Sequence, residues 1–280
     1  KTVTIEAEKN NSCNVMLYVT VTDNAGNVRT ESVAVDIDIT EPTITVDFDN
    51  DAAYKVVDGK GYFPDGRTAT VVITERTAHF DEAEATGNIK IYAVDALDKT
   101  VIENCSVLVS SWMPNGTGDN ATHTATIDFT ADANYEFTLN YEDLATNICK
   151  YENVKFAEGT VAPRFFAVDK TAPTGTVTAS ELGTWDKLIE TLTFGLWSRD
   201  TVDVTGTAND VTTPIESVSY YKTSDTIAKS IDELEAITNW SKFDGIKVHA
   251  DEKFVVYVKI VDSAGNVTYI STNGIIADEP

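Results

Sequence analysis

The chain has 280 residues and a formal net charge of −24, from 45 acidic and 21 basic side chains. Such a charge repels the phosphates of nucleic acids and anionic lipid surfaces, so we expect neither nucleic acid nor membrane as a partner. No run of 18 apolar residues occurs, so no membrane insertion is predicted. Val, Ile, Thr, Tyr and Phe are frequent, which favours strands over helices, and the length predicts about two complete domains.

The first 41 residues predict strands at residues 3–7, 15–22 and 28–39. A segment of this size cannot bury a core alone, because domains below roughly 40 residues usually need disulfides, a metal or a partner. Residues 1–41 are therefore either the C-terminal part of a truncated domain or a segment that borrows strands from another chain; we favour the first interpretation because it is simpler. We expect the chain to be a portion of a longer protein.

Residues 42–172 are predicted to form a complete β-sandwich. Its strands are expected at residues 44–48, 68–74, 88–95, 101–110, 122–129, 135–141 and 150–156. Several strands at this spacing, separated by Gly, Asn and Asp clusters, are typical of an antiparallel sandwich. Cys105 and Cys149 lie on separate predicted strands and either form a disulfide or remain as thiols; the second interpretation is favoured because sequence does not determine their distance.

Residues 173–280 are predicted to form a second complete sandwich. Its strands are expected at residues 175–179, 191–196, 202–207, 218–221, 246–248, 254–261 and 267–271. One short helix is predicted at residues 231–237, because Ser230 and Glu233 match a capping box. Barely two turns long, this helix must be held by tertiary packing.

One turn pattern occurs in all three segments. It reads Asp-Asn-Ala-Gly-Asn at 23–27, Asp-Leu-Ala-Thr-Asn at 143–147 and Asp-Ser-Ala-Gly-Asn at 262–266. Each copy follows an apolar alternation typical of a strand with one buried face. Asp can accept bonds from nearby backbone N–H groups, while Gly and Asn tolerate left-handed torsions. Thr146 replaces the Gly, so that turn must differ in conformation or carry strain.

We interpret this pattern as hairpin chemistry; the alternative makes the leading acids calcium ligands, namely Asp23, Asp143 and Asp262. Beyond the turns lie acidic segments that contain Pro, at residues 40–42, 169–173 and 278–280. A unit that repeats with its own linker predicts a tandem array.

Residues 254–276, with the sequence FVVYVKIVDSAGNVTYISTNGII, resemble the closing strands of bacterial immunoglobulin-like repeats. Such repeats occur in large surface proteins of Gram-positive bacteria, and the linkers resemble the joints of this family. The resemblance covers essentially the whole chain. It implies an all-β fold of tandem immunoglobulin-like antiparallel β-sandwiches, with neighbouring immunoglobulin-like domains of the same chain as partners.

The same resemblance implies an extracellular location, at the cell surface or cell wall, and a non-catalytic role as stalk, spacer or adhesin. Members share a fold rather than a ligand, so no binding residue is carried over. Some relatives contain Lys–Asn isopeptide crosslinks, but no matching set of Lys, acid and Asn is found here. The alternative is a module that binds carbohydrate or a host surface protein, as an accessory to a secreted glycan-degrading enzyme.

Enzyme activity is not predicted. The three histidines, His79, His123 and His249, lack the spacing of a zinc motif, and the sequence has no nucleophile elbow, phosphate loop or dinucleotide fingerprint. A glycosidase with paired acids would need a cleft that a thin sandwich rarely supplies.

Calcium is the one ion that the sequence suggests, and no other cofactor is predicted. Four acids are spaced like a calcium loop, namely Asp47, Asp49, Asp51 and Asp58. Ala52 replaces the Gly of the sharp turn, so a solvated strand end is the favoured interpretation. Acids at the linkers are a second hypothesis: Asp38 with Glu41, or Asp169 with the Asp143 turn, would share an ion and stiffen the array.

Trp112 and Trp197 are the candidate ligand-binding residues, because Trp beside polar groups is a common platform for a sugar ring. Each lies beside polar residues, yet burial is the favoured interpretation, since Trp is highly buried on average. Trp185 and Trp240 are expected to close the core.

Overall fold

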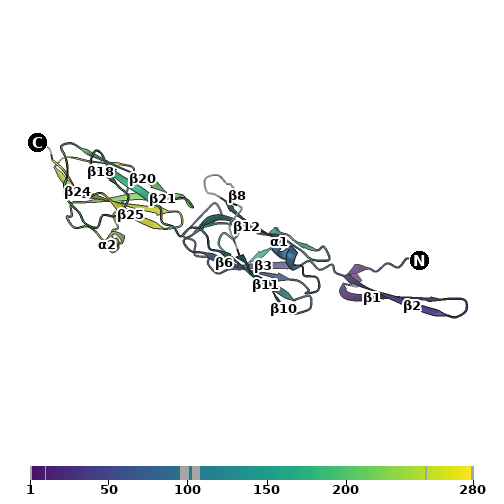
Figure 1. Cartoon of the computed structure of the whole chain (residues 1–280). Coiled ribbons are helices and arrows are strands. Elements are labelled where there is room, and N and C mark those ends of the chain that lie inside the picture. Colours follow the sequence, from purple (N-terminus) through teal and green to yellow (C-terminus); the bar gives the residue numbers. More distant parts are fainter. Residues whose placement is uncertain (1, 10, 95–100, 103–107, 250, 279–280) are drawn as a thin grey trace.

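A computed structural model gives the arrangement of the chain, and it describes all residues except 1, 10, 95–100, 103–107, 250 and 279–280. The side chains of residues 12–14, 93–94, 101–102 and 108 are also outside the description. A two-stranded hairpin is followed by two β-sandwiches, and the three segments succeed one another from the N-terminal to the C-terminal end (Figure 1). Among the described residues, no helix is long and apolar enough to cross a lipid bilayer.

The hairpin consists of β1 (Ser12–Thr22) and β2 (Val28–Ile37), paired in antiparallel register. Apolar side chains stay exposed on it; Val21, for example, is 63% exposed, because no second sheet of the described chain packs on either face. The predicted strand at residues 3–7 is wrong: the segment is irregular and ends in a 3₁₀ turn at Ala7–Lys9. The idea that residues 1–41 are part of a larger domain stays a prediction.

The second unit is a sandwich of two six-stranded sheets. The first sheet has the order β10-β11-β6-β3-β15, with β9 also paired to β11, and its strands are β3 (Thr43–Phe48), β6 (Arg67–Thr74), β9 (Leu108–Val109), β10 (Met113–Asn115), β11 (Thr122–Phe129) and β15 (Lys155–Phe156). The second sheet has the order β4-β5-β16-β12-β7-β8, with strands β4 (Lys55–Val57), β5 (Lys60–Phe63), β7 (Ile89–Val94), β8 (Val101–Ile102), β12 (Ala133–Leu139) and β16 (Phe165–Val168). A short hairpin of β13 (Tyr141–Glu142) and β14 (Ile148–Cys149) carries the second copy of the repeated turn.

The core of this unit is aromatic and encloses one arginine. Arg67 is 1% exposed, and its guanidinium lies 4.0 Å from the ring centroid of Phe48 and 4.1 Å from that of Phe63. Its Nη2 donates to Asp51 Oδ1 at 2.9 Å, and its Nε donates to a backbone carbonyl. Burial lowers the pKa of Arg67 to about 10, and Asp51 opposes this effect. The buried charge is therefore paired and hydrogen-bonded, as a folded interior requires.

The third unit is also a sandwich, and its core is separate from that of the second. One sheet has the order β18-β17-β20-β23, with strands β17 (Thr174–Ala179), β18 (Gly183–Trp185), β20 (Val202–Asn209) and β23 (Ile246–Val248). The other has the order β19-β26-β24-β21-β22, with β25 paired to β24, and contains β19 (Leu196–Ser198), β21 (Ile215–Thr223), β22 (Ser241–Lys242), β24 (Glu252–Asp262), β25 (Val267–Ser271) and β26 (Ile275–Ala277). The strand predicted at residues 191–196 is wrong for most of that range, because only Leu196, the first residue of β19, lies in a strand.

In the described part of the chain, two short α-helices interrupt the strands. Helix α2 (Ile231–Glu235) is the predicted one, and both halves of its capping box form between Ser230 and Glu233. Helix α1 (Glu82–Gly87) was not predicted, although Asp81 caps it by accepting bonds from the amides of Ala83 and Glu84. A six-residue helix has too few turns to show an apolar period, so its cap is its main sequence signal.

The three repeated turns have the same geometry. In the first, Asp23 Oδ1 accepts from the amides of Ala25 and Asn27, and Asp23 Oδ2 accepts from Asn27 Nδ2 at 2.7 Å. The other two copies make the same set of bonds. The fourth residue is left-handed in each copy, with φ of 86° at Gly26, 73° at Thr146 and 92° at Gly265. Thr146 thus keeps the glycine conformation and carries the strain.

We expect Thr146→Gly to raise the free energy of unfolding of the second unit. Glycine removes the strain of a β-branched residue in the left-handed conformation. Part of this gain is lost because glycine has more conformational entropy in the unfolded chain, so the net stabilisation is on the order of 1 kcal/mol. Denaturant unfolding measures the difference. Thr45→Gly, at an exposed position of strand β3, is the matched control and should destabilise; equal signs for the two variants would contradict the strain at Thr146.

Candidate functional site at the joints between units

The two joints are residues 38–42, which enter the second unit, and residues 169–173, which enter the third. Each begins with an Asp and ends with a buried Pro. In the first joint, Asn147 Nδ2 donates to the backbone carbonyl of Asp38 at 3.3 Å. In the second, Asn266 Nδ2 donates to the carbonyl of Asp169 at 2.8 Å. The repeated turn of each complete unit therefore binds the linker that enters that unit.

Asp169 is fully buried and is bonded to both neighbouring units. Its amide donates to the carbonyl of Phe63 in the second unit at 3.0 Å. Its Oδ2 accepts from the hydroxyl of Thr213 in the third unit at 2.6 Å. The residue therefore fixes the end of the second unit against the beginning of the third.

Further contacts cross the second joint. Asn134 Nδ2 donates to the carbonyl of Thr212 at 2.8 Å, and Lys55 forms an ion pair with Glu216. The ring of Tyr54 lies against Gly265, where an added Cβ would come within 2.5 Å of the ring atom Cδ2. The second and third units are thus joined by polar contacts and one aromatic contact.

Acids are crowded at the second joint. The carboxylates of Asp169, Asp210 and Asp262 each have an oxygen within 4.8 Å of the other two. Burial raises the pKa of Asp169 to about 6, and the nearby charges of Asp210 and Asp262 add to that rise. Burial also raises the pKa of Asp262, although bonds from Asn266 oppose the effect. Donors from amides and hydroxyls, rather than basic side chains, hold these carboxylates in place.

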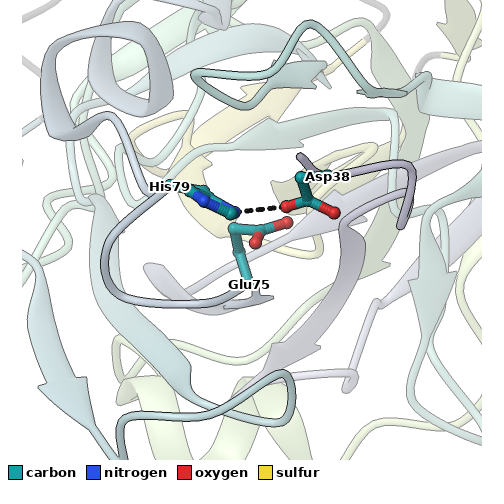
Figure 2. A group of neighbouring side chains, drawn as sticks. All are labelled: Asp38, Glu75 and His79. Atoms are coloured by element: carbon teal, nitrogen blue, oxygen red, sulfur yellow. Dashed lines mark hydrogen bonds and ion pairs between the residues drawn. The ribbon is translucent and has the colours of Figure 1, made fainter. Parts of the chain in front are cut away.

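The first joint has a different group of side chains, which we call the joint cluster: Asp38, Glu75 and His79 (Figure 2). His79 Nδ1 pairs with Asp38 Oδ2, and the carboxylate of Glu75 lies beside both. Glu75 is only 4% exposed, and burial raises its pKa to about 7, with Asp38 and Asp143 adding to the rise.

A cavity of about 190 Å³ adjoins the joint cluster. It is bordered by Asp38 and Glu75 and otherwise by polar residues, namely Thr40, Glu41, Thr43, Thr74, Asp119 and Asn120. The loop that carries His79 is bonded to the repeated turn, because the amide of Leu144 donates to the carbonyl of His79 at 3.0 Å. Linker, loop and turn thus meet at one place.

The four acids of the predicted calcium loop are not brought together. Asp47 is exposed on β3, and Asp49 Oδ1 accepts from the amide of Thr68 at 2.7 Å. Asp51 faces Arg67, and Asp58 lies in the β4–β5 turn. Among the described residues, the groups of acids and histidines close enough to share an ion lie at the two joints and contain none of these four.

Two other calcium hypotheses concerned the leading Asp of each repeated turn and the acids at the linkers. In all three turns the carboxylate of the leading Asp is bonded within its own turn, as hairpin chemistry requires. Glu41 borders the same cavity as Asp38. Asp169 lies beside Asp262 and not, as the sequence suggested, beside the Asp143 turn, because each linker contacts the turn of the unit that it enters.

The two candidate tryptophans have opposite surroundings. Trp112 is 6% exposed; its Nε1 donates to Thr86 Oγ1 at 3.0 Å and its ring packs edge-on against Phe80. It offers no free face to a sugar. Trp197, on β19, is 61% exposed.

Cys149 is a buried thiol, and burial raises its pKa. Cys105 lies outside the described residues, so the predicted alternatives for this pair, a disulfide or two thiols, stay open.

Sequence reasoning missed Glu75 and His79 as a pair. Both follow the end of strand β6 and are four residues apart. The close spacing of an acid and a histidine after one strand was the only local indication of a site. Asp38 lies 37 and 41 positions earlier than these residues in the sequence. Only the tertiary fold brings it to them.

Comparison with known proteins gives little further information. No family model matches the chain, and no curated protein matches it. A solved structure, described as Clostridium thermocellum CbhA fibronectin(III)-like modules, is similar at 14% identity and a TM-score of 0.27, over 84% of this chain and 94% of that chain. A score this low does not bear on function.

The buried Asp169 predicts a dependence of stability on pH. Its pKa is about 6 when folded and near 3.8 in the reference state, so between these values the folded chain keeps a proton that the unfolded chain has lost. The free energy of unfolding should therefore fall as pH rises through this interval, by on the order of 2–3 kcal/mol.

Asp169→Asn removes the charge, so its melting temperature relative to the wild type should rise by several degrees from about pH 4.5 to pH 8. Thermal unfolding followed by circular dichroism measures this difference. The exposed Asp65 provides a control, since Asp65→Asn has no burial to relieve. A difference for Asp169→Asn that stays constant with pH would rule out a buried charge at this joint.

Proposed function

We propose that the chain is a non-catalytic spacer or stalk segment of an extracellular protein, in which successive β-sandwiches are held at set angles by their joints. The observation that supports this most is the bond from the turn Asn to the carbonyl of the linker Asp, made in the same way at both joints. A repeated joint suits a protein that extends by adding units.

The architecture suits resistance to extension. In the third unit, β24 pairs with both β21 and β25 in long antiparallel ladders, so pulling on the chain loads many backbone bonds. The linkers are short, and their prolines are buried in the unit that follows. Short linkers that contain Pro restrict bending between neighbours.

The surface also suits an exposed position outside the cell. A net charge of −24 keeps neighbouring copies apart and soluble. The partners under this proposal are the adjoining immunoglobulin-like units, and a location at the cell surface or wall follows from the resemblance of the closing strands. No cofactor is needed for this role.

The joint bonds predict a measurable stiffness. In a double variant, Asn134→Ala removes the bond to Thr212 across the second joint, and Asn266→Ala removes the bond to the linker at Asp169. The second and third units should then sample a wider range of relative orientations. Small-angle X-ray scattering should show a broader distribution of overall dimensions. Asn27→Ala is the matched control, because it removes the same turn bond to Asp23 at a turn far from either joint. Identical profiles for the double variant and wild type would contradict the proposal.

A second candidate function rests on Trp197, an exposed residue that is followed in the sequence by Ser198 and Asp200. A free indole beside polar groups can stack on a sugar ring, so a carbohydrate-binding or adhesin role has one specific site in its favour. The test is retention on a glycan array. Binding that is lost in Trp197→Ala would support this role, whereas no retention, or retention that survives the substitution, would exclude Trp197 as the binding site.

A further inference from the structure

We propose that the joint cluster of Asp38, Glu75 and His79 is a site for one divalent transition-metal ion, best suited to Zn²⁺, and that the ion fastens the linker to the second unit. This role goes beyond that of a spacer and does not depend on it.

The donors match zinc better than calcium. The cluster offers one imidazole nitrogen and two carboxylates, with atoms within 4.8 Å of one another. Ligand atoms about 2.1 Å from a tetrahedral zinc ion lie roughly 3.5 Å apart, so small side-chain rotations suffice. Calcium needs six to eight oxygens, and imidazole is a ligand of zinc and its neighbours in the periodic table.

Glu75 places a buried carboxylate in the cluster. Its side chain belongs to a residue that is only 4% exposed, and its Oε1 accepts a hydrogen bond from the amide of Arg76 at 2.6 Å. The carboxylate lies toward Asp38 and His79 (Figure 2). A buried carboxylate close to a second acid is costly, and a cation between the two would remove that cost.

The surroundings allow a complete coordination shell. The cavity of about 190 Å³ bordered by Asp38 and Glu75 has room for water, which would provide a fourth ligand. The bond from the amide of Leu144 holds the backbone of His79 in place. A fixed backbone restricts the positions open to the imidazole and so helps to preorganise a metal ligand.

The position of the cluster gives the ion a structural consequence. Asp38 belongs to the linker, whereas Glu75 and His79 belong to the loop after β6. An ion bound by all three would therefore connect the linker to the second unit. The linker carbonyl at Asp38 is already bound by Asn147, but at 3.3 Å, longer than the 2.8 Å of its counterpart at the second joint.

The second joint is an internal comparison. Its three ligand-type side chains are all aspartates, held by amides and hydroxyls, and no histidine of the described residues belongs to this group. The chain should therefore bind one zinc ion tightly, at the first joint. Substitutions at the second joint should leave this binding unchanged.

Isothermal titration of the full chain with ZnCl₂, in a buffer that does not bind metals, tests the proposal. We expect saturable binding of one ion, weakened at least tenfold by Glu75→Gln and by His79→Gln. Asp210→Asn at the second joint and His249→Gln at an exposed histidine are the controls, and both should bind as the wild type does. CaCl₂ should not replace ZnCl₂ at comparable concentrations.

A second measurement guards against misfolded variants. Zn²⁺ should raise the melting temperature of the wild type and of both controls but not that of the two cluster variants, each of which must first show a wild-type circular dichroism spectrum. Absence of saturable binding, binding that survives both cluster substitutions, or binding lost in His249→Gln would overturn the proposal. Tighter binding of calcium than of zinc would also overturn it.

Discussion

The arrangement of this chain depends on one hydrogen bond that is made twice, from the side-chain amide of an Asn in a hairpin turn to the carbonyl of an Asp in the preceding linker. The same Asn also donates to the first Asp of its own turn. Its amide therefore satisfies the turn and the joint together. Any change that alters the turn also alters the angle at which the unit meets its neighbour.

This constraint explains why acids gather at the joints. The turn needs an Asp to accept its backbone amides, and the linker has another Asp at its start, so two carboxylates lie near each other whenever a linker contacts its turn. At the second joint, Asp210 from the loop after β20 joins the linker Asp and the turn Asp; at the first joint, Glu75 and His79 from the loop after β6 lie beside the linker Asp. The two joints resolve the resulting repulsion differently: the second uses hydroxyl and amide donors, whereas the first has a histidine among its acids.

Much of the fold could be predicted from the sequence, because period-2 patterns and turn residues are local signals. The repeated turn, the strands before it and helix α2 follow from neighbouring residues. Helix α1 and the strand at residues 3–7 were misjudged because short segments carry few periods. The site was harder to predict, since Glu75 and Asp38 become neighbours only through tertiary packing. The burial of Arg67 and its pairing with Asp51 were also not predictable, because no pattern in the neighbouring residues indicates them. Thr146 was recognised as unusual, but its backbone conformation required coordinates.

The central claim is that the turn of the third unit holds its linker, so that the second and third units keep one orientation in solution. Residual dipolar couplings of backbone amides in a weakly aligned sample measure that orientation directly. The account predicts that one alignment tensor fits the couplings of both units with the orientation seen in Figure 1. Two tensors of clearly different magnitude would contradict it, because they would show that the units move independently.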